Sequence, residues 1–265
     1  MSKKMATLVY ENQEQQVSWQ GYDLPDNDAF DSFITKDVAA RLNDEEGSIE
    51  FESHLRGLSL TGFGKSSLEA VLDAKIPEER DWAVGEAFAE AWLSQEHGVI
   101  WPWNMERDKR NANASLPGAD LIGFVINGTE LRLVLGEVKS STEKKYPPQV
   151  MSGRSGHIGH QIDNLANNLG TITQLLKWLC PRCKNTEFEG LYNGSISLYL
   201  NSGNKAVSIF GVLIRDTKPN ELDLKSRGKI LGNSLSAPTS CNLLALHLPC
   251  EIAELPERVN GGAAS

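Results

Sequence analysis

Two apolar, β-rich runs on either side of Asn127 and Gly128 constrain the fold of this chain more than any other feature. Residues 118–126 read GADLIGFVI, and residues 129–139 read TELRLVLGEVK. An Asn-Gly pair between two such runs is the strongest short-range signal for a β-hairpin, and it favours a two-residue type I′ turn. The sequence therefore predicts a hairpin that ends in a Glu-Val-Lys segment.

The hairpin brings three ionisable side chains to one face. With this turn, cross-strand pairing places Asp120 opposite Leu135. Paired residues on neighbouring strands point to the same face, and side chains along one strand alternate between faces. We therefore expect Asp120 to share a face with Glu137 and Lys139, at the end of a hairpin whose other residues are largely apolar.

Two carboxylates and an ammonium group in a half-apolar setting suit the chemistry of a divalent cation. Such a cluster is costly unless a counter-charge compensates it. Mg²⁺ or Mn²⁺ prefers oxygen ligands, and Mg²⁺ usually takes one or two carboxylates together with substrate phosphates. Asp120, Glu137 and the carbonyl of Val138 are thus candidate metal ligands, and Lys139 is a candidate to orient the attacking water and neutralise the scissile phosphate. The alternative is a surface hairpin with an ordinary ion pair.

The rest of the pattern predicts an α/β (α+β) domain with a mixed sheet flanked by helices. Helices are expected at residues 29–42, 80–96 and 158–179, the second of them amphipathic. Further strands are expected at residues 195–200, 206–215 and 242–248.

The cluster resembles the signature of the PD-(D/E)xK nuclease superfamily. Residues 117–120 read PGAD and residues 136–139 read GEVK, although two residues separate the proline from the aspartate, which are adjacent in that signature. The resemblance implies a restriction-endonuclease-like core and metal-dependent hydrolysis of DNA phosphodiester bonds. It also implies a further acidic metal ligand on the preceding helix, and Glu86, on the apolar edge of the predicted helix 80–96, matches that position.

Within the superfamily, the layout is similar to the nuclease subunit (HamA-like) of the Hachiman antiphage defence system. The shared features lie between residues 80 and 180, and are Gly-Glu on a helix, Gly-Ala-Asp, Gly-Glu-Val-Lys-Ser-Ser and a glutamine-bearing helix. The resemblance implies DNA as substrate and a superfamily 2 helicase (HamB-like) as partner. In this interpretation residues 76–217 are the nuclease core, residues 1–75 are a candidate partner-binding region, and residues 218–265 add a strand and a disordered tail.

Polar residues after the second strand of the hairpin are candidates for substrate contact. Gln161 matches a glutamine that some nucleases of the superfamily place near the metal. The other candidates for DNA contact are cationic or titratable: Lys144, Lys145, Arg154, His157 and His160. Ordinary solvated side chains are the alternative for each of these residues.

The net charge of −9 and the pI of about 5.1 bear on the partner. A protein that grips DNA unaided usually presents a basic surface, because phosphate neutralisation dominates affinity. We therefore expect the basic residues to be concentrated locally, or a partner to hold the DNA. A stand-alone restriction- or repair-type nuclease and a non-catalytic interaction subunit with a nuclease fold are the alternatives.

Two further features concern location and redox state. No apolar run approaches the roughly 18–20 residues of a membrane span, and no apolar segment follows the N-terminal lysines, so we expect a cytoplasmic protein. Cys180 and Cys183 have the spacing of half a zinc site, with Cys241 and Cys250 as candidate further ligands. Reduced thiols are the expected state.

Overall fold

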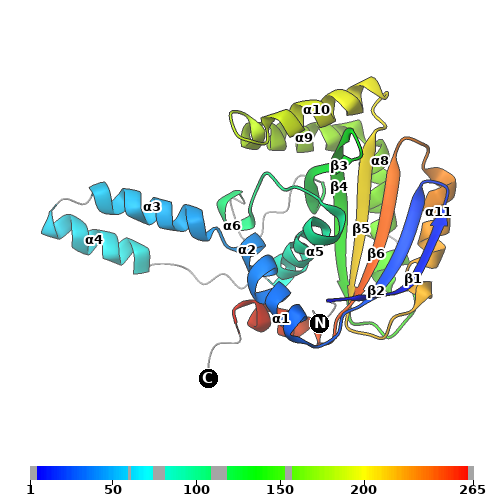
Figure 1. Ribbon diagram of the computed structural model, residues 1–265, viewed down its shortest axis with the longest axis horizontal. Coiled ribbons are helices and arrows are strands. Elements are labelled where there is room, and N and C mark those ends of the chain that lie inside the picture. Colours follow the sequence, from blue (N-terminus) through cyan, green and yellow to red (C-terminus); the bar gives the residue numbers. More distant parts are fainter. Residues whose placement is uncertain (1–4, 59–60, 74–80, 109–117, 153–156, 262–265) are drawn as a thin grey trace.

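The computed structural model describes residues 5–58, 61–73, 81–108, 118–152 and 157–261. Six strands in these residues form one sheet in the order β1-β2-β6-β5-β4-β3 (Figure 1). The inner strands β2, β6, β5 and β4 are parallel, whereas the edge strands β1 and β3 pair antiparallel with β2 and β4. The strands are β1 (Thr7–Glu14), β2 (Val17–Asp23), β3 (Leu121–Asn127), β4 (Glu130–Ser141), β5 (Val207–Arg215) and β6 (Ser240–His247). The predicted mixed sheet is thus confirmed.

Helices cover both faces of this sheet. A Cβ atom at Gly85, in α5 (Asp81–His97), would lie 3.2 Å from Ser140 Oγ of β4. A Cβ atom at Gly211 of β5 would instead lie 2.8 Å from Ile162 Cδ1, in α8 (Ile158–Asn167). In the β4–β5 register Gly211 pairs with Glu137, so the two residues point to the same face. Ser140 lies three residues after Glu137 on β4 and therefore points to the opposite face. Helices α5 and α8 therefore lie on opposite faces.

The remaining helical segments lie around the sheet or project from it. They are α1 (Asp28–Ser32), a π-helical stretch (Phe33–Val38), α2 (Ala39–Leu42), α3 (Glu45–Leu58), α4 (Gly62–Asp73), α6 (Met105–Asp108), α7 (Gln149–Ser152), α9 (Leu169–Cys183), α10 (Glu189–Asn201), α11 (Lys225–Ser234), α12 (Leu255–Val259) and two 3₁₀ turns (Glu221–Asp223 and Ile252–Glu254). Among the described residues there is no helix whose length and hydropathy would let it cross a bilayer.

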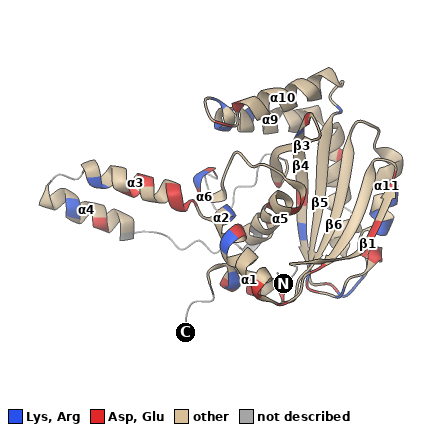
Figure 2. Ribbon diagram, viewed as in Figure 1, with Lys and Arg blue, Asp and Glu red and all other residues tan. Residues whose placement is uncertain are grey.

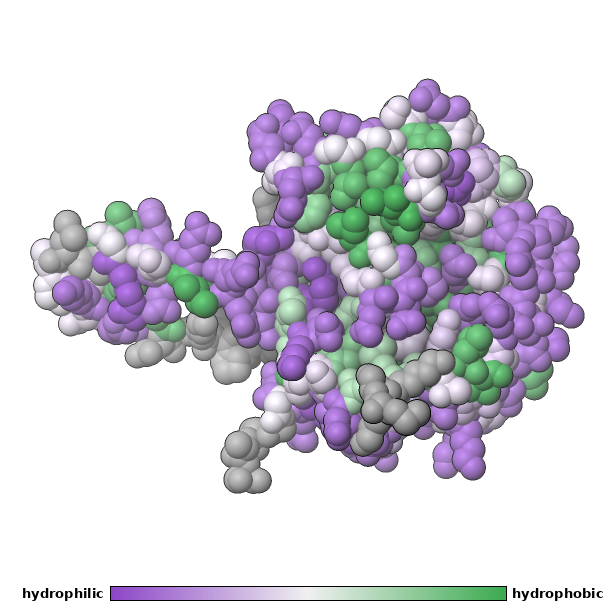
Figure 3. All heavy atoms as spheres, viewed as in Figure 1, coloured by the Kyte–Doolittle hydropathy of each residue, from purple (hydrophilic) through white to green (hydrophobic). Residues whose placement is uncertain are grey.

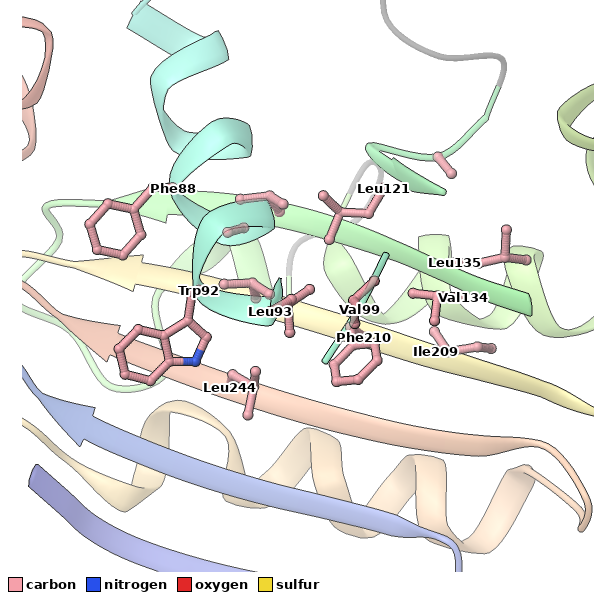
Figure 4. Close-up of a cluster of buried hydrophobic side chains, with 14 of the residues drawn as sticks. Phe88, Trp92, Leu93, Val99, Leu121, Val134, Leu135, Ile209, Phe210 and Leu244 are labelled. Carbon is pink, nitrogen blue, oxygen red and sulfur yellow. The ribbon is translucent and has the colours of Figure 1, made fainter. Parts of the chain in front are cut away.

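The α5 helix is buried on all sides rather than along one stripe. Towards the sheet, Phe88, Trp92 and Leu93 pack in a cluster with side chains of β3, β5 and β6 (Figure 4). The ring of Phe33 meets that of Phe88 at 5.2 Å, and on the other side of α5 the fully buried Glu90 carboxylate pairs with Arg41 at 2.6 Å. The expected amphipathic pattern is wrong because the N-terminal helices cover the outer side of α5.

The N-terminal region divides into two parts. Strands β1 and β2 extend the same sheet as the core strands, since β2 pairs in parallel with β6. Helices α3 and α4 instead form a hairpin that projects from the body (Figure 1), and its surface is mostly hydrophilic with scattered apolar side chains (Figure 3). Residues 7–23 therefore belong structurally to the core, which a boundary at residue 75 does not anticipate.

Two predicted elements differ from the structure. Residues 195–200 lie in α10, not in a strand, and Ser195 and Tyr199, one helical turn apart, face the interior. The apolar-polar alternation of this segment resembles a strand, but burial follows the helical period. The predicted helix 158–179 is two helices, because Asn168 leaves helical geometry and its side chain accepts a hydrogen bond from Thr171 N as the N-cap of α9.

The hairpin is confirmed, with a turn one residue later than expected. Gly128 and Thr129 form the turn, with Gly128 at a φ of 62°, and Asn127 pairs with Glu130 inside the ladder. This register pairs Leu121 with Gly136. The expected pairing was thus wrong by two residues, and a shift of two leaves every side chain on its expected face.

Candidate active site

Asp120, Glu137 and Lys139 come together at the open end of the hairpin. Asp120 immediately precedes β3, and its backbone N–H donates to Gly136 O at 3.0 Å, so it continues the ladder opposite Glu137. Its Oδ2 atom accepts a hydrogen bond from Val138 N at 2.9 Å. The Lys139 ammonium lies 3.7 Å from Asp120 Oδ2 and 3.4 Å from Glu137 Oε2. The predicted juxtaposition of these three side chains is confirmed.

Burial differs sharply within this cluster. Glu137 is only 2% exposed, whereas the side chains of Asp120 and Lys139 are 17% and 21% exposed. Burial raises the pKa of Glu137 to about 9, with the charge of Asp120 and a hydrogen bond to it adding to the rise and Lys139 opposing it. Two carboxylates against one ammonium thus hold a proton between them at neutral pH. A divalent cation would take the place of that proton, so the donor set fits Mg²⁺ or Mn²⁺.

The cluster lies on the face of the sheet that α8 covers. One row across the sheet joins Trp19, Leu243, Gly211 and Glu137. Because Gly211 has no side chain, the first turns of α8 pack directly over it, beside Glu137. The site therefore lies towards the carboxyl end of β4, one of the parallel strands, where ligands of open α/β sheets commonly bind.

Gln161 lies on the flank of α8 that faces this cluster. Gly159, on the other flank, contacts Arg227 of α11, and α11 packs over β2. At 100° per residue Gln161 points away from Gly159, towards the β4 side of α8. Its Oε1 atom is buried and accepts no hydrogen bond from the described residues. This unsatisfied oxygen is a second polar group on the side of the carboxylate pair.

The histidines of the accessory set lie at the start of α8, and the lysines lie in the loop after β4. His157 is the N-cap, and its Nδ1 accepts a hydrogen bond from His160 N at 3.2 Å. Partial burial and the charge of Arg227 lower the pKa of His157. Lys144 and Lys145 are exposed in the loop after β4. Arg154 lies outside the described residues.

The structure does not bring Glu86 into the cluster. Glu86 follows Gly85, which faces Ser140 on the opposite side of the sheet from Glu137. In the described parts of the chain, no group of three or more His, Cys, Asp or Glu side chains is arranged to hold a metal ion. Within the described residues, the structure thus places no carboxylate of α5 beside Asp120 and Glu137, because α5 packs on the opposite face of the sheet.

The Val138 carbonyl keeps its place as a candidate ligand. The N–H of Val138 points towards Asp120, and the N–H and C=O of one strand residue point to the same side. Val138 lies beyond the ladder with β3, whose last pair joins Leu121 to Gly136. Its carbonyl is thus directed to the edge at which Asp120 lies.

A buried charged network behind the site was not predicted. Arg215, the last residue of β5, is fully buried and donates to Ser141 O at 2.9 Å and Lys145 O at 3.2 Å. Its Nε lies 3.4 Å from the buried carboxylate of Asp223. Burial raises the pKa of Asp223 to about 6, against the opposing charge of Arg215. Arg215 thereby fixes the loop that leaves the Glu137–Lys139 strand, and an arginine closing the apolar run VSIFGVLIR is the signal that would have indicated it.

Cys180 and Cys183, which have the spacing of half a zinc site, are free cysteines near the end of α9. Burial raises the pKa of Cys183 to about 11. In comparisons with known proteins, no family model and no curated protein matches the chain. The residues themselves define the site: the buried carboxylate of Glu137, the partly exposed carboxylate of Asp120 and an adjacent ammonium at the end of a hairpin.

Proposed function

We propose that this protein is a metal-dependent nuclease that hydrolyses DNA phosphodiester bonds. The observation that carries the proposal is the buried carboxylate of Glu137, in contact with Asp120 and Lys139 and beside the glycine over which α8 packs. Among the described residues, Lys139 is the one cation paired with Asp120 and Glu137. A divalent cation in place of the proton that these carboxylates retain would also bind a phosphate.

The three side chains have separate roles in this proposal. Asp120 and Glu137, with the carbonyl of Val138, would hold Mg²⁺ or Mn²⁺. The ion would supply a Lewis acid for the phosphate and lower the pKa of water. Lys139, whose ammonium touches both carboxylates, would neutralise the scissile phosphate and orient the attacking water. Gln161 Oε1, buried and without a hydrogen-bond donor among the described residues, would help to position that water.

We further propose that the chain acts as a nuclease subunit, similar to that of the Hachiman system, with a superfamily 2 helicase as partner in the cytoplasm. The support is electrostatic. A chain with a net charge of −9 repels a duplex before any local basic patch can act. A motor subunit with its own DNA channel would supply the grip. The candidate contacts Lys144 and Lys145 are too few to hold a long duplex.

Cleavage assays with a matched pair of substitutions test the nuclease proposal. Plasmid DNA should be cut with Mg²⁺ or Mn²⁺ and left intact in EDTA, and Lys139→Ala should abolish cutting. Glu137→Gln should do the same. Glu86→Gln makes the same chemical change at a buried carboxylate on the other face of the sheet, and should keep most of the activity. Full activity in EDTA, or wild-type cutting by folded Glu137→Gln protein, would sink the proposal.

The partner proposal has its own test in DNA affinity. The lone chain should bind duplex DNA poorly at about 150 mM salt, near physiological ionic strength. Binding on the order of 10 nM, as for a typical specific DNA-binding protein, would show that no partner is needed to hold the substrate. That outcome would favour a stand-alone restriction- or repair-type nuclease.

A further inference from the structure

Helix α11 carries a group of cations on the same face of the sheet as the Asp120–Glu137–Lys139 cluster. Its sequence begins Lys225-Ser-Arg-Gly-Lys229, and basic residues along α11 are visible in Figure 2. A Cβ atom at Gly228 would lie 2.3 Å from the ring of Trp19, so α11 packs over β2. Trp19 belongs to the row of residues that ends at Glu137. In a strongly acidic protein, this local concentration of positive charge beside the site is a candidate phosphate contact.

Arg227 reaches from α11 across to the first turn of α8. Its Nη2 atom lies 3.4 Å from Met151 O and 3.5 Å from His157 Nδ1. The guanidinium occupies the space beside Gly159, where a Cβ atom would lie 2.1 Å from Arg227 Cζ. The absence of a side chain at Gly159 therefore decides where this guanidinium lies.

The guanidinium of Arg227 has no acidic partner within the described residues. Lys225, two residues earlier, pairs with Glu221 at 3.1 Å, whereas no ion pair of Arg227 with any described carboxylate is formed. Both of its contacts involve the same nitrogen, Nη2, and both are long for a hydrogen bond and therefore weak. Most of the five donors of a guanidinium remain for an anion, and their fork matches the oxygens of a phosphate.

The spacing of neighbouring strands gives the distance between Arg227 and the Asp120–Glu137–Lys139 cluster. Glu137, Gly211 and Leu243 lie on adjacent strands, about 4.8 Å apart in each step. Helix α8 packs over β4 and β5, and Arg227 lies on the flank of α8 that faces α11, so its guanidinium is on the order of 10 Å from Glu137. One DNA strand carries a phosphate for roughly each 3.4 Å of helix axis. A few consecutive phosphates of one strand therefore bridge the two positions.

We infer that Arg227 is a phosphate-binding residue that holds the DNA backbone a few nucleotides from the scissile bond, with Gly159 keeping its guanidinium in place. The inference rests on the proposed nuclease function and names a contact that the motif does not include. His157, which faces the same guanidinium, completes the polar side of this contact. The substrate strand would thus run from the Glu137 cluster past the start of α8 towards α11.

The test measures the salt dependence of DNA binding with a short fluorescent duplex and Ca²⁺ in place of Mg²⁺. Arg227→Gln should weaken binding roughly tenfold at low salt and lower the slope of log affinity against log salt by about 0.9, the loss of one phosphate contact. Gly159→Ala keeps every charge but displaces the guanidinium, so it should weaken binding in the same direction. The displaced atoms are the end of a flexible side chain, and thermal unfolding should show both variants folded.

Arg258→Gln is the matched control. Arg258 lies beside Asp26, Asp31 and Glu254, and its replacement changes the net charge by the same amount. An unchanged slope in this control, with losses in both Arg227→Gln and Gly159→Ala, is the expected result. Equal losses in Arg227→Gln and Arg258→Gln would reduce the effect to net charge and overturn the inference.

Two other outcomes separate this inference from the nuclease proposal. Wild-type protein that binds and cuts DNA, with an Arg227→Gln variant of unchanged slope, would overturn the role of Arg227 alone. Wild-type protein that neither binds the duplex at low salt nor cuts DNA with Mg²⁺ or Mn²⁺ would overturn the proposed function, and the role of Arg227 with it.

Discussion

Replacement of Glu137 by glutamine should stabilise the metal-free protein in a pH-dependent way. Burial beside Asp120 raises the pKa of Glu137 from an ordinary 4.5 to about 9. The folded protein therefore keeps a proton that the unfolded chain releases above pH 4.5, and the stability of the wild type falls as the pH rises from about 4.5 to about 9. Glutamine does not titrate, so Glu137→Gln should not lose stability over this range.

The size of the effect follows from the same values. The interval between the ordinary pKa of 4.5 and pH 7 is about 2.5 pH units. Each unit is worth about 1.4 kcal/mol, so the free energies of unfolding of the two proteins should differ by on the order of 3 kcal/mol at pH 7. For a chain of this length that corresponds to a rise in Tm of about 6 °C. Below pH 4.5 the two proteins should unfold alike, because Glu137 is then protonated in both states.

Thermal unfolding followed by circular dichroism in EDTA, from pH 5 to pH 9, measures this difference. Glu130→Gln, on the same strand with a side chain 49% exposed, is the control and should show no comparable trend. Addition of Mg²⁺ should raise the Tm of the wild type and have little effect on Glu137→Gln. A Glu137→Gln protein that is less stable than the wild type, or that differs from it by a constant amount across this range, would refute the electrostatic reasoning.

Three further predictions concern packing and buried charge in the fold. Gly211→Val should cost about 1–3 kcal/mol and reduce DNA cleavage, because α8 must move away from the strand beside Glu137; chemical unfolding and plasmid cleavage measure both, and unchanged values would contradict the packing of α8. Arg215→Met should cost about 3–5 kcal/mol, since it leaves the buried Asp223 carboxylate without its cation; unfolding by urea checks this, and a neutral result would show that the pair is replaceable. Phe88→Ala, at 0% exposure, should cost about 3–5 kcal/mol, whereas Phe63→Ala on the projecting hairpin, at 85% exposure, should change stability by less than about 0.5 kcal/mol; equal Tm losses would contradict these burials.

The site could be predicted because its geometry is local. Asp120, Glu137 and Lys139 lie on two strands joined by a two-residue turn, and a period of two places them on one face whatever the rest of the fold does. The turn was wrong by one residue and the register by two, yet an even shift preserves the face. The strand at residues 206–215 was recognised for a similar reason, since a continuous apolar run of this length is typical of a strand buried on both faces.

The errors arose where distant segments compete for the same surface. Nothing local to residues 80–96 indicates which face of the sheet α5 covers, and this choice separates Glu86 from Glu137. Nothing local to residues 195–200 excludes a strand, because the alternation Ser-Ile-Ser-Leu-Tyr-Leu satisfies a period of two. Packing of α10 against β4 decides for a helix.

Sequence alone therefore determined the hairpin, the shared face of its three ionisable side chains and the mixed α/β class, since each depends on backbone periodicity over a few residues. Tertiary structure alone decided three features. These are the burial that raises the pKa of Glu137, the packing of α8 over Gly211, and the approach of Arg227 to Gly159. These features join residues far apart in the chain, and their energies come from close packing and from removal of charge from water. Both quantities depend on the neighbours that the complete fold supplies.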